Sequence, residues 1–109
     1  MPAIPEVVDL SRDDVETGLA SKALILVDVR EPHEFAMGHI PGSVSMPLSS
    51  FDPAELVAYA GQRVVFSCAA GVRSVHALQA TQHAGLPLRE HYAGGFKDWL
   101  MSGGPVERG

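Results

Sequence analysis

An uninterrupted apolar run at residues 23–27 constrains the fold of this chain more than any other feature of its sequence. A strand that is apolar at every position is buried on both faces, which is typical of a parallel sheet covered by helices on either side. Strand and helix patterns alternate along the chain, which predicts an α/β domain with a mainly parallel sheet. We expect strands at 7–8, 23–27, 43–46, 63–67 and 89–92, and helices at 12–20, 31–37, 53–60, 74–84 and after 94–95.

Composition allows one compact domain and argues against several kinds of partner. The chain has 109 residues, 46% of them hydrophobic, so we expect a single domain over 1–109, with its core at about 5–101 and a loose tail at 102–109. The net charge is −5 without a basic cluster, which argues against nucleic acid and anionic membranes as partners. No apolar run is long enough to span a bilayer, and the first residues show no signal-peptide pattern. We therefore expect a monomer in the cytoplasm.

Cys68 is the sole cysteine, so it cannot form a disulfide within the chain. A reducing compartment would keep its thiol free. The histidines, at positions 33, 39, 76, 83 and 91, are not closely paired with the cysteine or with each other, which argues against zinc. We expect neither a metal nor an organic cofactor.

The loop after the strand at 63–67 has the composition of an anion cradle. It runs Cys68-Ala69-Ala70-Gly71-Val72-Arg73-Ser74 and leads into the predicted helix at 74–84. Amides at a helix start lack internal partners, a glycine lets successive amides curl round one centre, and an arginine adds positive charge. Such surroundings lower the pKa of a thiol from about 8.5, so we predict a stabilised thiolate at Cys68, against the alternative of a small buried hydrophobe. Ser74 is expected to cap the helix and to donate a hydrogen bond toward the sulfur.

Other polar and aromatic residues are expected to support this site. Asp28 and Arg30 follow the strand at 23–27, so they lie at the same sheet edge as the cysteine. We interpret them as structural, paired with each other and with loop backbone, rather than as substrate ligands. His39 is interpreted as a turn residue whose ring bonds a backbone group, rather than as a proton shuttle. Phe96, Trp99 and Leu100 are expected on one face of the last helix. We assign Phe96 and Trp99 to the core rather than to a pocket.

Three separated motifs make the chain similar to one known family. They are Asp28-Val29-Arg30-Glu31 running through Glu34-Phe35 to Gly38-His39-Ile40-Pro41-Gly42-Ser43 with Met46-Pro47, the loop at 68–74, and Gly94-Gly95-Phe96 with Trp99. In order and spacing they resemble the single-domain rhodanese family of sulfurtransferases, over roughly residues 5 to 101. The resemblance implies a doubly wound α/β domain whose central parallel five-stranded sheet is flanked by helices.

The resemblance also implies sulfur transfer at the loop. Cys68 would be the nucleophile that accepts a sulfane sulfur and becomes a persulfide. The substrate would be bound by the rest of the loop, Ala69, Ala70, Gly71, Val72, Arg73 and Ser74. The donor would be thiosulfate or a thiol persulfide, and the acceptor would be cyanide, a thiol or an acceptor protein. A thiolate is the nucleophile that this exchange requires, so a general base is not needed once the thiol is ionised.

The length and side chains of the loop distinguish sulfur transfer from related reactions of cysteine enzymes. Four residues lie between Cys68 and Arg73, whereas cysteine phosphatases and arsenate reductases have five, so this ring suits one sulfur atom better than a phosphoryl group. Arg73 is the single basic side chain of the loop, and Ala69 and Ala70 would not hold a sulfonate. A thiol-borne persulfide is therefore at least as good a donor as thiosulfate.

Two alternatives to a free-standing enzyme stay open. Rhodanese-like domains also serve as non-catalytic binding or regulatory modules, although an intact Cys68 and a complete loop argue against this. A partner-dependent sulfur relay would take persulfide sulfur from one protein and pass it to another. His91 stands before the double glycine, where the family is often apolar, and we interpret it as tolerated variation.

Overall fold

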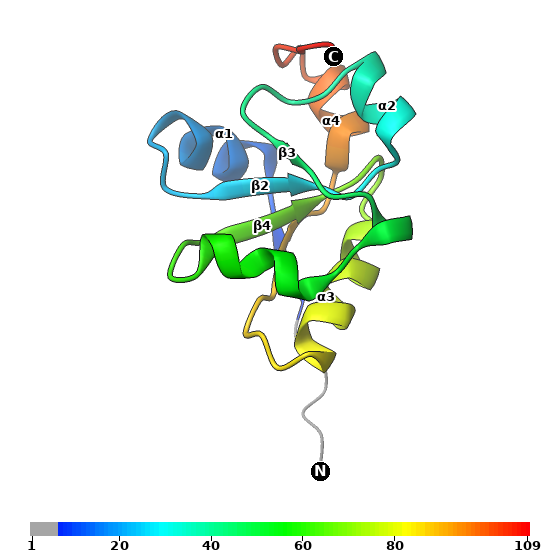
Figure 1. The fold of residues 1–109 in the computed structure, drawn as a ribbon. Helices are drawn as coiled ribbons and strands as arrows, with labels where there is room; N and C mark the ends of the chain where they lie inside the picture. Colours follow the sequence, from blue (N-terminus) through cyan, green and yellow to red (C-terminus); the bar gives the residue numbers. More distant parts are fainter. Residues whose placement is uncertain (1–6) are drawn as a thin grey trace.

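A parallel five-stranded sheet forms the centre of the protein, with the strand order β1-β5-β4-β2-β3 (Figure 1). The computed structural model describes residues 7–109, so the first two residues of the predicted core lie outside the described part. The strands are β1 (Val8–Leu10), β2 (Ile25–Asp28), β3 (Val44–Ser45), β4 (Val64–Ser67) and β5 (Glu90–Tyr92). The helices are α1 (Arg12–Ala20), α2 (Pro32–Met37), α3 (Arg73–His83) and α4 (Gly95–Met101), with 3-10 segments η1 (Leu48–Ser50) and η2 (Pro53–Tyr59).

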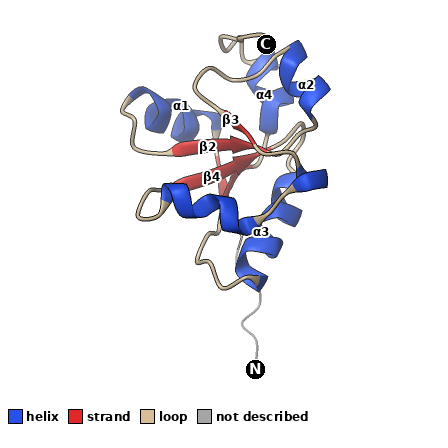
Figure 2. Ribbon diagram, in the orientation of Figure 1, coloured by secondary structure: helices blue, strands red, loops and turns tan. Residues whose placement is uncertain are grey.

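Helices cover both faces of the sheet, as Figure 2 shows. Neighbouring residues of β2 point to opposite faces and both are fully buried: Leu26 belongs to the core beneath α1 and α4, and Val27 to the core beneath α3 and η2. Burial on both faces explains why the strand is apolar without interruption. The doubly wound α/β fold with a five-stranded parallel sheet is therefore confirmed.

Two helical segments differ in detail from the sequence prediction. Asp52 accepts a hydrogen bond from the Ala54 amide, as a helix-capping residue does, but η2 is a 3-10 helix and not an α-helix. Its one buried residue is Leu56, while Val57 is 72% exposed, so the segment has no apolar stripe at α-helical spacing to pack on the sheet. In α4, Leu100 is 51% exposed, so it does not share the inner face as expected.

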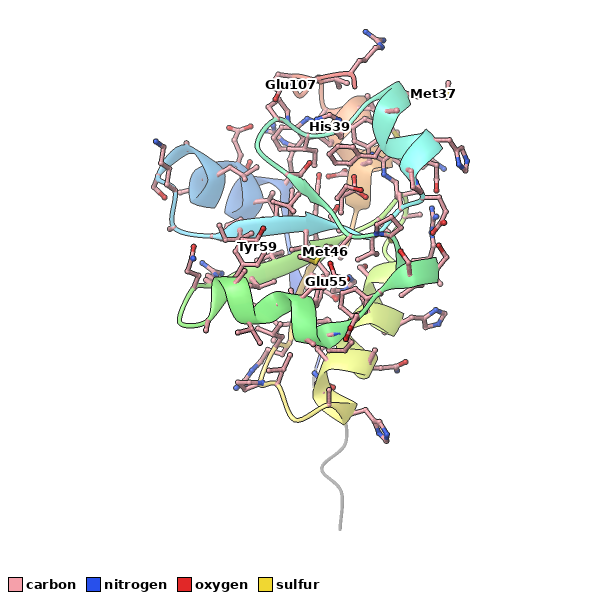
Figure 3. All side chains as sticks on the ribbon, in the orientation of Figure 1. Met37, His39, Met46, Glu55, Tyr59 and Glu107 are labelled. Carbon is pink, nitrogen blue, oxygen red and sulfur yellow. The ribbon has the colours of Figure 1, made fainter. Side chains whose placement is uncertain are left out.

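The expectation of a loose tail at 102–109 is wrong. The tail returns to the body of the protein, where the backbones of His39 and Glu107 exchange hydrogen bonds of 2.8 and 2.9 Å, a pair labelled in Figure 3. The carbonyl of Pro105 accepts a 2.7 Å hydrogen bond from the indole of Trp99, and Val106 packs on the core. A buried indole N–H needs an acceptor, and the tail supplies it.

Two features are absent from residues 7–109. No helix in this part of the chain is both long enough and apolar enough to cross a membrane. Within the same residues, no three side chains of the histidine, cysteine, aspartate or glutamate type gather as a metal site would require.

Candidate active site

The sulfur of Cys68 lies beneath the loop that joins β4 to α3. The residue follows the last residue of β4 and is 1% exposed. The amide of Gly71 donates a hydrogen bond to the Sγ atom at 3.1 Å. Gly71 has φ of +86°, and a Cβ atom there would collide with the backbone carbonyl oxygen of Ala93. The fold of this loop round the sulfur therefore requires glycine at position 71.

The surroundings of Cys68 favour its ionised form. Burial raises the pKa of the thiol, but hydrogen bonds from the Ser74 hydroxyl and from the amides of Ser74, Ala70 and Gly71 outweigh it. The net result is a lowered pKa. The lowering comes from dipoles fixed in place by the fold, as in other anion-binding loops.

Helix α4 holds the outer side of the same loop. The amide of Phe96 donates to the Cys68 carbonyl at 2.8 Å, and the amide of Lys97 donates to the Ala69 carbonyl at 3.0 Å. Gly95 has φ of +65°, and a Cβ atom at this position would lie 2.6 Å from the Cys68 carbonyl oxygen. Gly95 thus lets α4 approach closely and engage the loop carbonyls, which leaves loop amides to face the sulfur.

Arg73 directs its donor fork at Glu34 and not at the sulfur. Its guanidinium makes two hydrogen bonds to the carboxylate of Glu34, at 2.7 and 3.0 Å. The hydrogen bond from Arg73 is the main reason that the pKa of Glu34 falls to about 2. The same contact is the main reason that the pKa of Arg73 rises, and the nearby Cys68 charge adds a smaller part. The pair ties α2 to the first turn of α3, and the loop's one cation is already engaged.

Ser74 lies in the first turn of α3 but does not cap it. The helix begins at Arg73, and its N-cap residue, Val72, makes no side-chain capping bond. The Ser74 hydroxyl oxygen instead lies 3.6 Å from the Cys68 Sγ atom and 2.7 Å from the Nδ1 atom of His91. The contact with the sulfur that the sequence predicted is present, and a second partner accompanies it.

His91 is a site residue that sequence reasoning missed. It is 3% exposed, and the strand register aligns it with Asp9 in β1 and Phe66 in β4. Its Nε2 atom lies 2.7 Å from a carboxylate oxygen of Asp9, a residue far away in the sequence. The signal for this role was the placement of a histidine within a short strand next to the strand that carries the cysteine.

Asp28 and Arg30 form a buried pair beside the loop. Their carboxylate and guanidinium approach to 2.8 Å, and each side chain is 5% exposed. Arg30 also donates to the Gly38 carbonyl at 2.8 Å, and its guanidinium carbon lies 4.3 Å from the centre of the Phe96 ring. The pair therefore joins the end of β2 to α2 and α4, and within residues 7–109 it makes no hydrogen bond to the sulfur.

The side chains of the remaining candidates have other partners. The Nδ1 atom of His39 is 2.9 Å from the Phe35 carbonyl oxygen, and the two rings stack with centres 3.7 Å apart. Trp99 is 3% exposed and belongs to the core, and Phe96 packs against that core. None of these side chains makes a hydrogen bond to the loop at 68–74 among the bonds found in residues 7–109.

Comparison with known proteins agrees with this geometry. A family model described as Rhodanese-like domain matches residues 11–102. The chain belongs to the rhodanese-like family. It is 31% identical to human thiosulfate:glutathione sulfurtransferase, over 84% of this chain and 91% of that protein. It is 35% identical to mouse thiosulfate sulfurtransferase/rhodanese-like domain-containing protein 3, over 80% of this chain. The structure of a human single-domain sulfurtransferase superposes with a TM-score of 0.69 at 29% identity, covering 91% of this chain and 97% of that one.

The relatives define the family more closely than they define a substrate. The chain spans 64% of the mouse protein and 47% of a Synechocystis relative that is described as uncharacterized. The family model ends at residue 102, so the packed tail lies beyond the matched region. Relatives in this rhodanese-type family include sulfurtransferases, and the identity of donor and acceptor has to be argued from this chain's own residues.

Proposed function

We propose that this protein is a sulfurtransferase that carries a sulfane sulfur as a persulfide on Cys68. The observation that carries the proposal is the 3.1 Å hydrogen bond from the Gly71 amide to the Sγ atom, within a loop that lowers the pKa of the thiol. A thiolate attacks sulfane sulfur, and reactivity of a thiol follows its thiolate fraction and access. The relatives that are sulfurtransferases support the same reaction class.

The reaction runs in two displacements that need no external oxidant or reductant. The Cys68 thiolate attacks the outer sulfur of the donor, and a bond forms between these two sulfur atoms. The bond between the outer and inner sulfur atoms of the donor breaks, and the inner sulfur leaves with the bonding electron pair. The leaving group is a thiolate from a thiol persulfide, or sulfite from thiosulfate. An acceptor thiolate or cyanide then attacks the outer sulfur of the persulfide, and the Cys68 thiolate departs with its electron pair, as in other thiol exchange reactions.

The pairing of Arg73 favours a thiol persulfide over thiosulfate as donor. A sulfonate is best held by a free guanidinium fork or a lysine. The fork of Arg73, the single basic side chain of the loop, is bonded to both carboxylate oxygens of Glu34. Ala69 and Ala70 bring no donor side chain. The loop therefore favours a donor without a sulfonate, because its single guanidinium is already bonded to Glu34.

The proposal is tested by measuring thiocyanate formed from cyanide with thiosulfate or glutathione persulfide as donor. Wild type should catalyse transfer from both donors, faster from the persulfide, and Cys68→Ser should match the uncatalysed background. Equal turnover by Cys68→Ser would overturn the role of Cys68. Transfer to a protein acceptor alone, with no small-molecule turnover, would identify the partner-dependent relay.

A second variant tests the argument about donors. Glu34→Ala removes the carboxylate that occupies Arg73 and leaves Cys68 and the loop amides in place. The ratio of thiosulfate turnover to persulfide turnover should rise in this variant. A ratio equal to that of wild type would show that the engagement of Arg73 does not decide the donor.

A further inference from the structure

A row of hydrogen bonds connects the buried sulfur with the surface of the protein. Ser74 Oγ lies 3.6 Å from Cys68 Sγ and 2.7 Å from His91 Nδ1. His91 Nε2 lies 2.7 Å from Asp9 Oδ1. The side chain of His91 is 4% exposed, while that of Asp9 is 71% exposed. The four residues come from different elements, since β1, β5, α3 and the end of β4 contribute one residue each.

The donors and acceptors along this row can be assigned from the chemistry of each group. A carboxylate only accepts, so His91 carries a proton on Nε2 and donates it to Asp9. If His91 is neutral, its Nδ1 atom accepts from the Ser74 hydroxyl, and the Ser74 oxygen is then free to accept from a protonated Cys68 thiol. If His91 is an imidazolium, Nδ1 donates to Ser74, and the Ser74 hydroxyl donates to a Cys68 thiolate. The sulfur and the imidazole thus stand at the two ends of one hydrogen-bonded row. A protonated thiol goes with a neutral imidazole, and a thiolate goes with an imidazolium.

We propose that His91 is a positioning residue that accepts the proton of the Cys68 thiol through Ser74 and is held in its cationic form by Asp9. The inference rests on the proposed function and deepens it. The thiol proton moves to Ser74 Oγ while the Ser74 hydroxyl proton moves to His91 Nδ1. Serine is neutral before and after, and a thiolate and an imidazolium replace a thiol and an imidazole. A buried thiol is thereby ionised without passing its proton through the loop.

The groups around His91 support this assignment. On one side β1 places the Asp9 carboxylate against the ring, and on the other side β4 aligns the apolar Phe66 with it and ends at Ser67, one residue before Cys68. Helix α3 contributes the Ser74 hydroxyl, and its neighbouring cation, Arg73, is engaged by Glu34. The Ser74 hydroxyl bond also lowers the pKa of Cys68, as expected for a hydroxyl that donates to the anion. The anion nearest to the imidazole is therefore Asp9 among the polar partners described for it.

The direction in which the pH midpoint of Cys68 alkylation moves, when His91 is replaced, distinguishes a proton acceptor from a merely structural histidine. The rate of Cys68 alkylation by iodoacetamide is measured against pH in wild type, His91→Leu and Asp9→Ala, with urea unfolding as a check on folding. Loss of the imidazolium should move the midpoint of the profile upward, so that alkylation at pH 6 falls about three- to tenfold while the rate at high pH is unchanged. If His91 instead only accepts the Ser74 proton, its removal frees that hydroxyl for the sulfur, and the midpoint stays or moves downward. That outcome would overturn the proposal.

Two further comparisons control for effects of the substitutions other than loss of the hydrogen-bonded row. Asp13→Ala removes another exposed carboxylate from the same end of the chain, whose side chain is 86% exposed, and should leave the profile unchanged. In a Ser74→Ala background, Asp9→Ala should have no additional effect, because the row is already broken. An equal effect of Asp9→Ala with and without Ser74 would show that it acts by another route and would overturn the proposal.

Imidazole nitrogen chemical shifts test the reciprocal effect. At one fixed pH near neutrality, the His91 ring should show the imidazolium pattern in wild type and shift toward the neutral pattern in Cys68→Ser, which cannot supply the thiol proton. An unchanged ring pattern would contradict the relay. This reading is separate from sulfur transfer: a relay with no persulfide formation would refute the proposed function alone, and persulfide formation with an unchanged ring would refute the relay alone.

Discussion

Replacement of Gly71 by alanine tests how the loop stabilises the thiolate. At φ of +86° an alanine is strained by about 1–2 kcal/mol. Its Cβ atom would also collide with the carbonyl oxygen of Ala93, a backbone atom that cannot rotate away. Overpacking of this kind costs about 1–3 kcal/mol more, so Gly71→Ala should lose about 2–5 kcal/mol of unfolding free energy. The loop must move, and the 3.1 Å bond from the Gly71 amide to Cys68 lengthens.

The loss of that bond should appear in the reactivity of the thiol. A hydrogen bond to a charged group contributes about 1.5–3 kcal/mol, so its loss should raise the pKa of the thiol. Urea unfolding gives the stability, and the pH dependence of iodoacetamide alkylation gives the pKa of Cys68. Gly61→Ala is the matched control, because Gly61 has φ of +82° and open space where a Cβ atom would lie. Equal destabilisation by the two substitutions, with an unchanged alkylation profile in Gly71→Ala, would show that neither the contact with Ala93 nor the Gly71 amide has the role assigned to it.

Further predictions concern the ion pairs near the loop. The pKa of Glu34 is about 2 in the folded protein against an ordinary 4.5, so its carboxylate stabilises the fold above pH 4.5 and this contribution is lost as the pH falls toward 2. Glu34→Gln should therefore lower the melting temperature at pH 7, with the difference from wild type closing between pH 4.5 and 2; a constant difference would show that the pair with Arg73 is not responsible. Arg30→Met should cost about 3–5 kcal/mol in urea unfolding because it leaves the Asp28 carboxylate buried without its partner, whereas Arg12→Met, at an exposed pair, should cost about 1 kcal/mol or less. Equal costs for these two variants would contradict the assignment of Asp28 and Arg30 as buried support.

The architecture was predictable because burial leaves a local trace in the sequence. The apolar run at 23–27 predicted a strand covered on both faces, and β2 has that environment. The helix predicted at 12–20 is observed as α1, and its start is marked locally by Ser11 and Asp14, which accept hydrogen bonds from each other's backbone amides. Such signals depend on neighbours within a few residues, so one sequence suffices to see them.

Other features were not predictable because they depend on distant contacts. The tail at 102–109 is polar and rich in glycine, and its packing depends on the indole of Trp99 finding the Pro105 carbonyl. The engagement of Arg73 by Glu34 joins two helices that are adjacent only in space. His91 and Asp9 meet because β1 and β5 are neighbours in the sheet, although they stand at opposite ends of the chain. The sequence showed the composition of the loop but not which distant residues would contact it.

Whether Cys68 carries the transferred sulfur is shown by the intact mass of the protein. Wild type and Cys68→Ser are incubated briefly with glutathione persulfide or thiosulfate and weighed by mass spectrometry. Wild type should gain about 32 Da, the mass of one sulfur atom, which cyanide or a thiol removes, and Cys68→Ser should show no gain. Absence of the adduct with both donors, in folded wild type whose thiol can still be alkylated, would contradict the proposed role of Cys68.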